Sequence, residues 1–327
     1  MNMNKIFRVR THDAPLTYDR LTIDSTGAFL VGELERLDPK VHEPLLAFTW
    51  SRDMPLRRDV TLGDEATSFM KSNFASPGNQ GANGKHYIGQ STTQIAGVQE
   101  DIDKDTYPMF PWGIEVAYSV FDLAKAEQTG RPIDARKIND VQRIYQMEMD
   151  EVAYVGDSTI KAFGLLNQPD VTISPASGAW TIGKDIDEIL ADINDLLYET
   201  TISSATAVVP SKLLIPWKQF GMLVSRKVSD AANMSALEYL KKNTLSNAVN
   251  GRELEIYPCK WAMGAGASGA DRMVAYTQEE DYVRMPIVPL LRTPLEYRGI
   301  SHIFTYYGTF GGVQVVYPET IRYMDGI

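Results

Sequence analysis

The chain has 327 residues, and its 32 lysines and arginines against 42 aspartates and glutamates give a formal net charge of −10. An apolar share of 44% is typical of a folded protein, and the length suits two domains or one large domain with insertions. The acidic balance argues against a general nucleic-acid binder, which needs clustered basic side chains. The single cysteine excludes an intramolecular disulfide framework, and the four histidines lack the spacing of a metal site.

No stretch of the sequence approaches the roughly 20 apolar residues that a membrane-spanning helix requires. Residues 1–10 have no apolar segment and no cleavage pattern of a secretory signal. We therefore expect a soluble, non-secreted chain that folds in a reducing compartment.

Residues 1–55 are predicted to form an extended arm. Strand-like pieces such as Ala28–Val31 alternate with glycines and prolines, and no helical period develops. Such an arm cannot bury its own apolar side chains, so those near its end need another surface to pack on. They are Leu45, Leu46, Phe48 and Trp50.

The next segment, 56–111, contains few core-forming residues. Its middle part, Phe74–Gly97, interleaves glycines with Asn, Gln, Ser and Thr. The flanking pieces Val60–Leu62 and Thr93–Val98 are predicted to pair as a long β-hairpin with its tip in that glycine-rich part. A segment of this length without a core is usually functional or serves interaction.

A half-buried strand and a long helix follow. Apolar residues alternate with other residues over 113–120, which predicts a strand. From about 134 to 155 apolar residues recur at steps of three and four, which predicts a helix about 33 Å long at about 1.5 Å per residue. Its apolar stripe comprises Ile138, Val141, Tyr145, Met149 and Val152. The charged residues predicted on its surface are Lys137, Asp140, Arg143, Glu148 and Asp150.

Helices and strands alternate between about 165 and 275, which indicates an α/β subdomain. The helices expected there are at 185–198, 216–224 and 235–242. The strands expected there are at 205–209, 254–257 and 272–276. Beyond 281 the pattern is β again, and we expect its strands to join the sheet begun by 113–120. They are predicted at 297–307, 312–317 and 321–323.

Two motifs copy ligand-binding patterns without their full context. Gly264, Gly266 and Gly269 have the spacing of a dinucleotide-binding loop, but a strand rather than a helix is predicted after them, so we interpret them as a plain loop. Asp101, Asp103 and Asp105 copy the start of a calcium loop. Thr106 and Trp112 replace its required glycine and glutamate, which favours a solvated strand or loop.

No pairing of a nucleophile with a base, and no cofactor or metal motif, emerges from the sequence. Cys259 is interpreted as a buried structural thiol, although the following Lys260 is of a type that lowers a thiol pKa. Paired carboxylates of the glycosidase type are invisible to this kind of analysis, so an acidic cytoplasmic hydrolase stays open as an alternative.

The order of these parts resembles the major capsid proteins of tailed bacteriophages with the Hong Kong 97-type fold. The local sequences that carry the resemblance are a helix end, Glu148–Asp157 with Gly156-Asp157, and a following Gly164-Leu165-Leu166-Asn167 turn. The C-terminal runs Gly311–Pro318 and Tyr323–Ile327 are also similar. Gly156 suits a left-handed helix cap and Gly164 a tight reversal.

The resemblance implies an α+β capsid fold divided into named parts. These are an N-terminal arm at 1–55, an E-loop hairpin at 56–111, a P-domain with a spine helix at 112–163, an α/β A-domain at 164–275, and a return to the P-domain sheet at 276–327. The residues expected to act in assembly are Gly78, Gly81, Gly84, Lys85 and Gly89 of the hairpin, and Gly264, Gly266 and Gly269 of the A-domain.

The resemblance also implies a function. The chain would assemble with itself into pentamers and hexamers of an icosahedral shell in the cytoplasm of a bacterial host, without a membrane and without enzymatic activity. It would enclose double-stranded DNA through weak, non-specific contact, and meet scaffold, portal or decoration proteins. The sequence shows no long charged N-terminal helix, which implies a separate scaffold or none, and we expect no covalent crosslinking. Within the same fold, an encapsulin-type shell remains the alternative.

Overall fold

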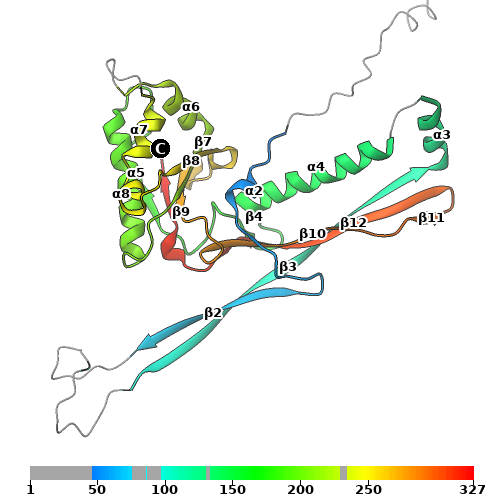
Figure 1. Ribbon diagram of the computed structural model, residues 1–327, viewed down its shortest axis with the longest axis horizontal. Helices are drawn as coiled ribbons and strands as arrows, with labels where there is room; N and C mark the ends of the chain where they lie inside the picture. Colours follow the sequence, from blue (N-terminus) through cyan, green and yellow to red (C-terminus); the bar gives the residue numbers. More distant parts are fainter. Residues whose placement is uncertain (1–45, 76–85, 87–96, 130–132, 229–233) are drawn as a thin grey trace, which may run out of the picture. The chain divides into compact units, whose positions relative to one another are not determined.

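The computed structural model describes residues 46–75, 86, 97–129, 133–228 and 234–327 (Figure 1). The chain divides into two units, 1–47 and 48–327, and the account below concerns the second unit. Most of the predicted arm and the predicted hairpin tip lie outside the described residues. The tip residues concerned are Gly78, Gly81, Gly84, Lys85 and Gly89.

The larger sheet of the described residues has the strand order β1-β10-β12-β3-β2, with β11 beside β12 and β13 beside β10. All its pairs are antiparallel except β1 with β10. The long strand β3 pairs with β12 along 109–119 and with β2 along 99–108. The strands are β1 Leu56–Arg57, β2 Ala66–Ala75, β3 Gln99–Ser119, β10 Val283–Arg292, β11 Glu296–Arg298, β12 Ser301–Gly311 and β13 Gln314–Val315.

Helix α4, Ile133–Tyr154, confirms the helix predicted from the apolar period. It follows α3, Val120–Thr129, and packs on the larger sheet. Val141 lies among Val116, Tyr118 and Phe304, which come from β3 and β12. The apolar stripe therefore holds α4 on the half of β3 that is paired with β12.

The smaller sheet has five strands in the order β6-β14-β9-β7-β8. Helices α5 to α8 cover one of its faces, and the other face belongs to the core around α2 and α4. The strands are β6 Ile173–Pro175, β7 Lys212–Pro216, β8 Glu255–Cys259, β9 Arg272–Tyr276 and β14 Arg322–Asp325. The helices are α5 Ile186–Ser203, α6 Trp217–Ser225, α7 Ala236–Lys242 and α8 Leu245–Asn250.

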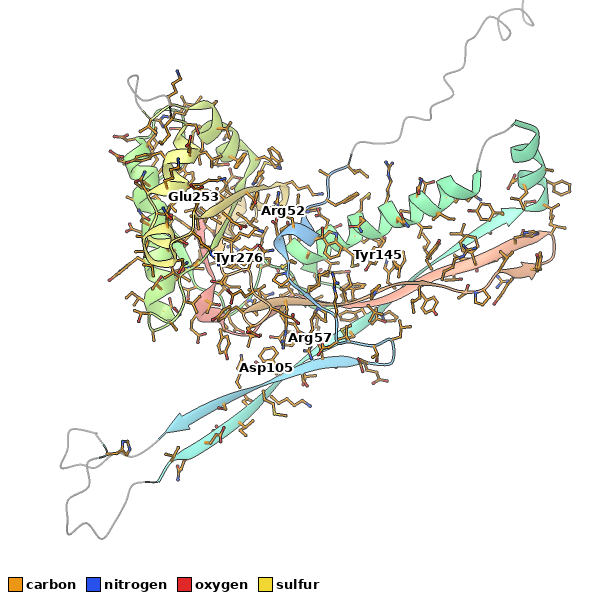
Figure 2. The ribbon with its side chains drawn as sticks, in the orientation of Figure 1. Arg52, Arg57, Asp105, Tyr145, Glu253 and Tyr276 are labelled. Carbon is orange, nitrogen blue, oxygen red and sulfur yellow. The ribbon has the colours of Figure 1, made fainter. Side chains whose placement is uncertain are left out.

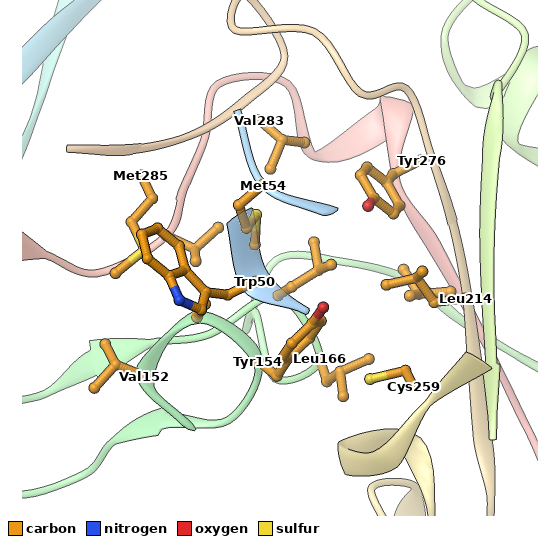
Figure 3. Packing of buried hydrophobic residues seen from close by; sticks show 14 of the residues in the cluster. Trp50, Met54, Val152, Tyr154, Leu166, Leu214, Cys259, Tyr276, Val283 and Met285 are labelled. Carbon is orange, nitrogen blue, oxygen red and sulfur yellow. The ribbon is translucent and has the colours of Figure 1, made fainter. Parts of the chain in front are cut away.

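Alternate residues of β7 serve the two cores. Leu213 and Ile215 pack with the helices, whereas Leu214 faces the core around α2, which is the short helix Trp50–Asp53. Trp50 is buried at the centre of that core beside Met54 (Figure 3). The predicted need of Trp50 for a packing surface is thereby confirmed.

Short elements complete the described fold. The strands β4 Gly156–Asp157 and β5 Ala162–Phe163 pair with each other directly after α4. Three single turns of 3₁₀ helix are η2 Lys260–Ala262, η3 Ala267–Gly269 and η4 Pro318–Thr320. Among the described residues, no helix is both long enough and apolar enough to cross a membrane.

The structure corrects several predicted strands. The segment predicted at 205–209 is a turn, because Ala205 and Thr206 have left-handed φ angles of 52° and 65°. The strand predicted at 297–307 is a hairpin, β11–β12, that reverses at Gly299. The strand predicted at 321–323 does exist as β14, but it pairs with β9 and β6 in the smaller sheet.

The hairpin in the first half of the chain is formed by other residues than those predicted. Val60–Leu62 lies outside the strands, and the paired segments are β2 and the first half of β3. These strands were not predicted because β2 and residues 99–108 are largely polar. Neither segment has the alternation of apolar and polar residues that a buried face imposes.

Candidate assembly interface

The first candidate surface is the two-stranded ribbon formed by β2 and by residues 99–108 of β3, called the ribbon below. Along this stretch neither strand has a further partner among the described residues, because β12 pairs only with 109–119. At about 3.3 Å per residue the ribbon is about 33 Å long. An isolated two-stranded ribbon is marginally stable, and its free edges are able to pair with another chain.

On one face of the ribbon, side chains of the two strands contact each other. The rings of Phe69 and Tyr107 stack with centroids 5.7 Å apart. Next to them, Lys71 Nζ lies 2.5 Å from a carboxylate oxygen of Asp105, and this hydrogen bond raises the pKa of Lys71. Asp105 is labelled on the ribbon in Figure 2. Lys71 therefore neutralises one of the acidic side chains on this face.

The opposite face of the ribbon carries two exposed apolar side chains among polar ones such as Ser72 and Lys104. Met70 and Ile102 alternate with the residues above and are 73% and 59% exposed. They come from the two paired strands, so they belong to a single surface. Exposed apolar side chains beside free strand edges make this face a candidate interaction surface.

The base of the ribbon is fixed to the rest of the unit. The Arg284 guanidinium from β10 lies over the Phe69 ring, 5.5 Å from its centroid. Its Nε donates to the side-chain oxygen of Gln314 at 3.2 Å, and the Gln314 amide bonds the Thr67 hydroxyl. The ribbon is therefore anchored where it leaves the sheet, and its exposed face is presented from a defined place.

The second candidate feature is the turn after α4, where Gly156 and Gly164 meet. Gly156 has a φ of 76°, the left-handed conformation that the sequence predicts for the helix end. A Cβ atom on Gly156 would lie 2.3 Å from the carbonyl oxygen of Ala162. One on Gly164 would lie 2.4 Å from the carbonyl oxygen of Tyr154. Neither position therefore has room for a residue larger than glycine.

The chain returning through this turn satisfies the last carbonyl groups of α4. Leu165 N donates to Ala153 O at 2.8 Å, and Leu166 N donates to Tyr154 O at 2.9 Å. Both leucine side chains are buried in the core around α2. These contacts bind the end of α4 to the start of the following segment.

Polar side chains close the same turn. The side-chain oxygen of Asn167 accepts from Gly164 N at 2.7 Å, and its amide nitrogen donates to Val155 O at 2.5 Å. Asp157 accepts from Thr159 N at 2.8 Å. The motif from Gly156 to Asn167 is thus a structural joint, and any part that it plays in assembly remains a prediction.

The Gly264–Gly269 loop has no dinucleotide-binding geometry. It leads through a single 3₁₀ turn into strand β9, so the interpretation as a loop is confirmed. A Cβ atom on Gly266 would lie 2.8 Å from the Asp325 carboxyl carbon, and Asp325 accepts from Ala267 N at 3.0 Å. The backbone of this loop is therefore packed against the C-terminal strand, and its role in assembly is untested.

Asp150 was predicted on the surface of α4, and this prediction is wrong. The side chain is fully buried, and its carboxylate accepts from the backbone nitrogens of Thr49 and Trp50 at 2.9 and 3.1 Å. Trp261 Nε1 and Lys260 Nζ contact its other oxygen at 2.8 and 2.7 Å. It therefore caps α2 and binds it to α4.

A signal for this role was present in the sequence. Ala153 and Tyr154 follow Asp150 at three and four residues, and both are buried. They form a second apolar stripe on the last turns of the helix, beside the stripe that contains Met149. A carboxylate on such a stripe is buried, and it then needs several donors.

A second buried carboxylate, Asp53, was missed entirely. Lys212 Nζ from β7 lies 3.1 Å from Asp53 Oδ1, and Arg52 Nε lies 2.7 Å from the same atom. Tyr154 donates its hydroxyl to the other oxygen. Burial lowers the pKa of Lys212 and raises that of Tyr154. This cluster ties α2 to the smaller sheet.

Cys259 lies in the same core and is fully buried, as predicted for a structural thiol. Burial raises its pKa to about 12, so the thiol stays protonated. Asp101, Asp103 and Asp105 occupy alternate positions of β3. In the part of the chain that the structure describes, no group of three or more ligating side chains suits a metal ion.

Comparison with protein families gives a match over most of the chain, because the model of the major capsid protein family covers residues 84–327. The chain belongs to the major capsid protein family. As a major capsid protein it is a structural component of a capsid shell and not an enzyme. The alternative of an acidic hydrolase is therefore wrong. A comparison with curated proteins returns no match.

Solved structures show the same fold. The capsid of Myoviridae phage XM1 is 18% identical, with a TM-score of 0.76 over 90% of this chain and 98% of that one. The capsid of a native GTA particle is 12% identical, with a TM-score of 0.60 over 93% and 98%. Microbacterium phage Oxtober96 gives 9% identity and a TM-score of 0.59 over 94% and 99%. The major capsid protein is therefore a mixed α+β chain with a phage-capsid fold.

Proposed function

We propose that this major capsid protein assembles into the pentamers and hexamers of an icosahedral shell of a tailed bacteriophage. The ribbon serves as the E-loop that each subunit lays on its neighbour. The observation that carries the proposal is a ribbon about 33 Å long, at about 3.3 Å per residue, whose edges are free and whose one face exposes Met70 and Ile102. The fold that it shares with the phage capsids supports the same conclusion.

The chemistry of the ribbon suits binding to a second copy. Met70 and Ile102 are available for burial, and the edges of the ribbon offer backbone hydrogen bonds. On the other face Lys71 pairs with Asp105, while Asp101 and Asp103 keep that face acidic and less suited to burial. Many weak contacts of this kind add up in a closed shell, because each subunit makes several of them.

The net charge of −10 suits a container for double-stranded DNA. A wall that repels phosphate confines DNA without gripping it, so contact with the packaged genome is weak and non-specific. Scaffold, portal and decoration proteins are the further partners that we propose, with assembly in the cytoplasm of a bacterial host. The named domain boundaries and the roles of the hairpin-tip residues belong to the same proposal.

The test compares the two faces of the ribbon. A double variant, Met70→Gln with Ile102→Gln, removes both exposed apolar side chains of this face and is expected to reduce particle yield by at least about tenfold, because about 1.5–3 kcal/mol of burial is lost per side chain. The matched control, Asp101→Gln with Asp103→Gln, alters the opposite face of the same strands. Particle mass is measured by light scattering over a concentration series, with negative-stain images of the heaviest fraction.

We expect normal particles from the control and few from the apolar-face variant. Normal particles from both would show that the ribbon does not mediate assembly. A wild-type chain that stays monomeric at every concentration, even beside a scaffold protein, would contradict the proposed shell. The contents of the particles separate a phage capsid from an encapsulin-type compartment, which encloses proteins instead of DNA.

A further inference from the structure

Helix α5 carries an exposed stripe that its own subunit leaves uncovered. Positions at steps of three and four residues, Ala191, Asp195, Tyr198 and Ile202, all lie on the outer side of the helix. Tyr198 and Ile202 are 58% and 52% exposed although both are large apolar residues. The stripe is therefore acidic at one end and apolar at the other.

Helix α6 carries a second exposed stripe. Trp217 and Val224, seven residues apart, lie on one side of the helix and are 51% and 50% exposed. Gly221 lies between them, and a Cβ atom there would meet nothing within 4 Å. The stripe thus has a flat centre between two apolar side chains, a shape into which another helix fits closely.

The two stripes lie at different edges of the same helical layer. Helix α5 contacts β14 and β9, whereas α6 contacts β7 and β8 (Figure 1). In the strand order β6-β14-β9-β7-β8 these are the two sides of the sheet. A subunit with different apolar surfaces on its two sides is able to bind copies of itself head to tail.

The charges of the two stripes are complementary. Helix α5 contains five acidic residues and no basic one, and Asp187, Glu188 and Asp195 have no ion-pair partner among the described residues. Beside the α6 stripe the exposed charges are basic, namely Lys218 and Lys227. Apposing α6 with α6 would bring these lysines together, whereas apposing α6 with α5 brings opposite charges together.

We propose that the α6 stripe of one subunit packs on the α5 stripe of the next copy, and that repetition of this contact closes the ring of subunits. The proposal rests on the proposed shell function and names the surfaces that join neighbours within a ring. Trp217 and Tyr198 are the aromatic anchors of the contact, a residue type enriched at interface centres. Lys218 and Asp195 lie at its margin and set the pairing.

The test is crosslinking between introduced cysteines. The native Cys259 does not interfere, because its protonated thiol is buried and out of reach of reagents. Ile202→Cys and Val224→Cys are combined in one chain, and assembled particles are treated with a short bismaleimide and run on a denaturing gel. We expect a covalent ladder that ends at the ring size. Each single variant should give monomers, since a head-to-tail contact never brings identical positions together.

A matched control combines Val224→Cys with Tyr297→Cys. Tyr297 is more exposed than Ile202 but lies on β11 of the larger sheet, so this pair should give no ladder. Intact particles without a ladder from the Ile202–Val224 pair would overturn the ring contact and leave the shell function standing. Covalent dimers from either single variant would also overturn it. Failure of the wild-type chain to form particles, even beside a scaffold protein, would overturn the shell function and this contact together.

A charge exchange supplies a measurement that is independent of cysteine chemistry and of folding. Asp195→Lys and Lys218→Asp are each expected to lower particle yield by about tenfold, because like charges then face each other across the contact. Both substitutions in one chain should restore most of the yield. A combined variant as poor as the worse single one would contradict the pairing.

Discussion

The five-stranded sheet and the ribbon are both held by backbone pairing of strands, but their side chains are packed differently. All five residues of β7, Lys212–Pro216, are buried, because helices cover one face of the sheet and the core around α2 covers the other. In the ribbon, by contrast, most side chains beyond the anchored base are exposed on both faces. The sheet is packed on both faces within its own subunit, and we propose that the ribbon is packed against another copy.

The largest expected effect contrasts an ion pair from each region. Lys212→Ala leaves Asp53 buried with one cation fewer, and it should lower the free energy of unfolding by about 3–5 kcal/mol. Lys71→Ala removes the partner of Asp105 on the half-exposed ribbon and should cost less than about 1 kcal/mol. Urea unfolding measures both. Equal losses would contradict the difference between the two regions.

The next effect contrasts two glycines. Gly156→Ala puts a Cβ atom into the carbonyl group of Ala162 at a left-handed φ, and strain with overpacking should cost about 2–4 kcal/mol. Gly97→Ala, beside the ribbon, meets open space and should change the free energy of unfolding by less than about 0.5 kcal/mol. Thermal and urea unfolding of the two variants give the answer. A tolerated Gly156→Ala would show that the joint after α4 is loose.

Alkaline pH should weaken the core. Burial raises the pKa of Cys259 and of Tyr145, each to about 12, so the folded chain keeps protons that the unfolded chain releases at about pH 8.5 and 10. The stability that these groups contribute is present in full below about pH 8.5 and is lost as the pH rises toward 12. Urea unfolding at pH 8, 9.5 and 11 should show a falling free energy. Cys259→Ala should reduce the fall between pH 8 and 9.5, and an unchanged slope would contradict the buried thiol.

The smallest effect on folding belongs to the apolar face of the ribbon. Met70→Gln with Ile102→Gln should change the free energy of unfolding by less than about 0.5 kcal/mol per site, because both side chains are exposed in the isolated subunit. The same double variant should lose most of its assembly. A large loss of stability in the monomer would show instead that the ribbon packs on its own subunit.

Much of the fold was predictable where one face of an element is buried. The apolar period of Ile138, Val141 and Met149 predicts α4 within one residue at each end, and the period in α5 predicts that helix too, although it runs on to Ser203. Gly156 and Gly164 predict the turn, because no other residue fits there. The family resemblance followed from this turn and from the order of the parts.

Other features depend on contacts distant in sequence. The ribbon strands were placed wrongly because exposed strands have no apolar alternation, and their register is fixed only by pairing between β2 and β3. Strand β14 joins the smaller sheet by pairing with β9, about fifty residues earlier. Asp150 shows the same limit, since its donors come from 49–50 and 260–261.

The sequence by itself determined the acidic character, the long helix, the glycine joint and the family to which the chain is similar, because these depend on composition and local period. Only the tertiary structure decided which carboxylates are buried, which sheet receives the last strand, and where exposed apolar side chains gather. Those outcomes depend on which distant segments meet, and a local pattern carries no information about the partner. The ribbon and the stripes of α5 and α6 are therefore surfaces that the fold reveals.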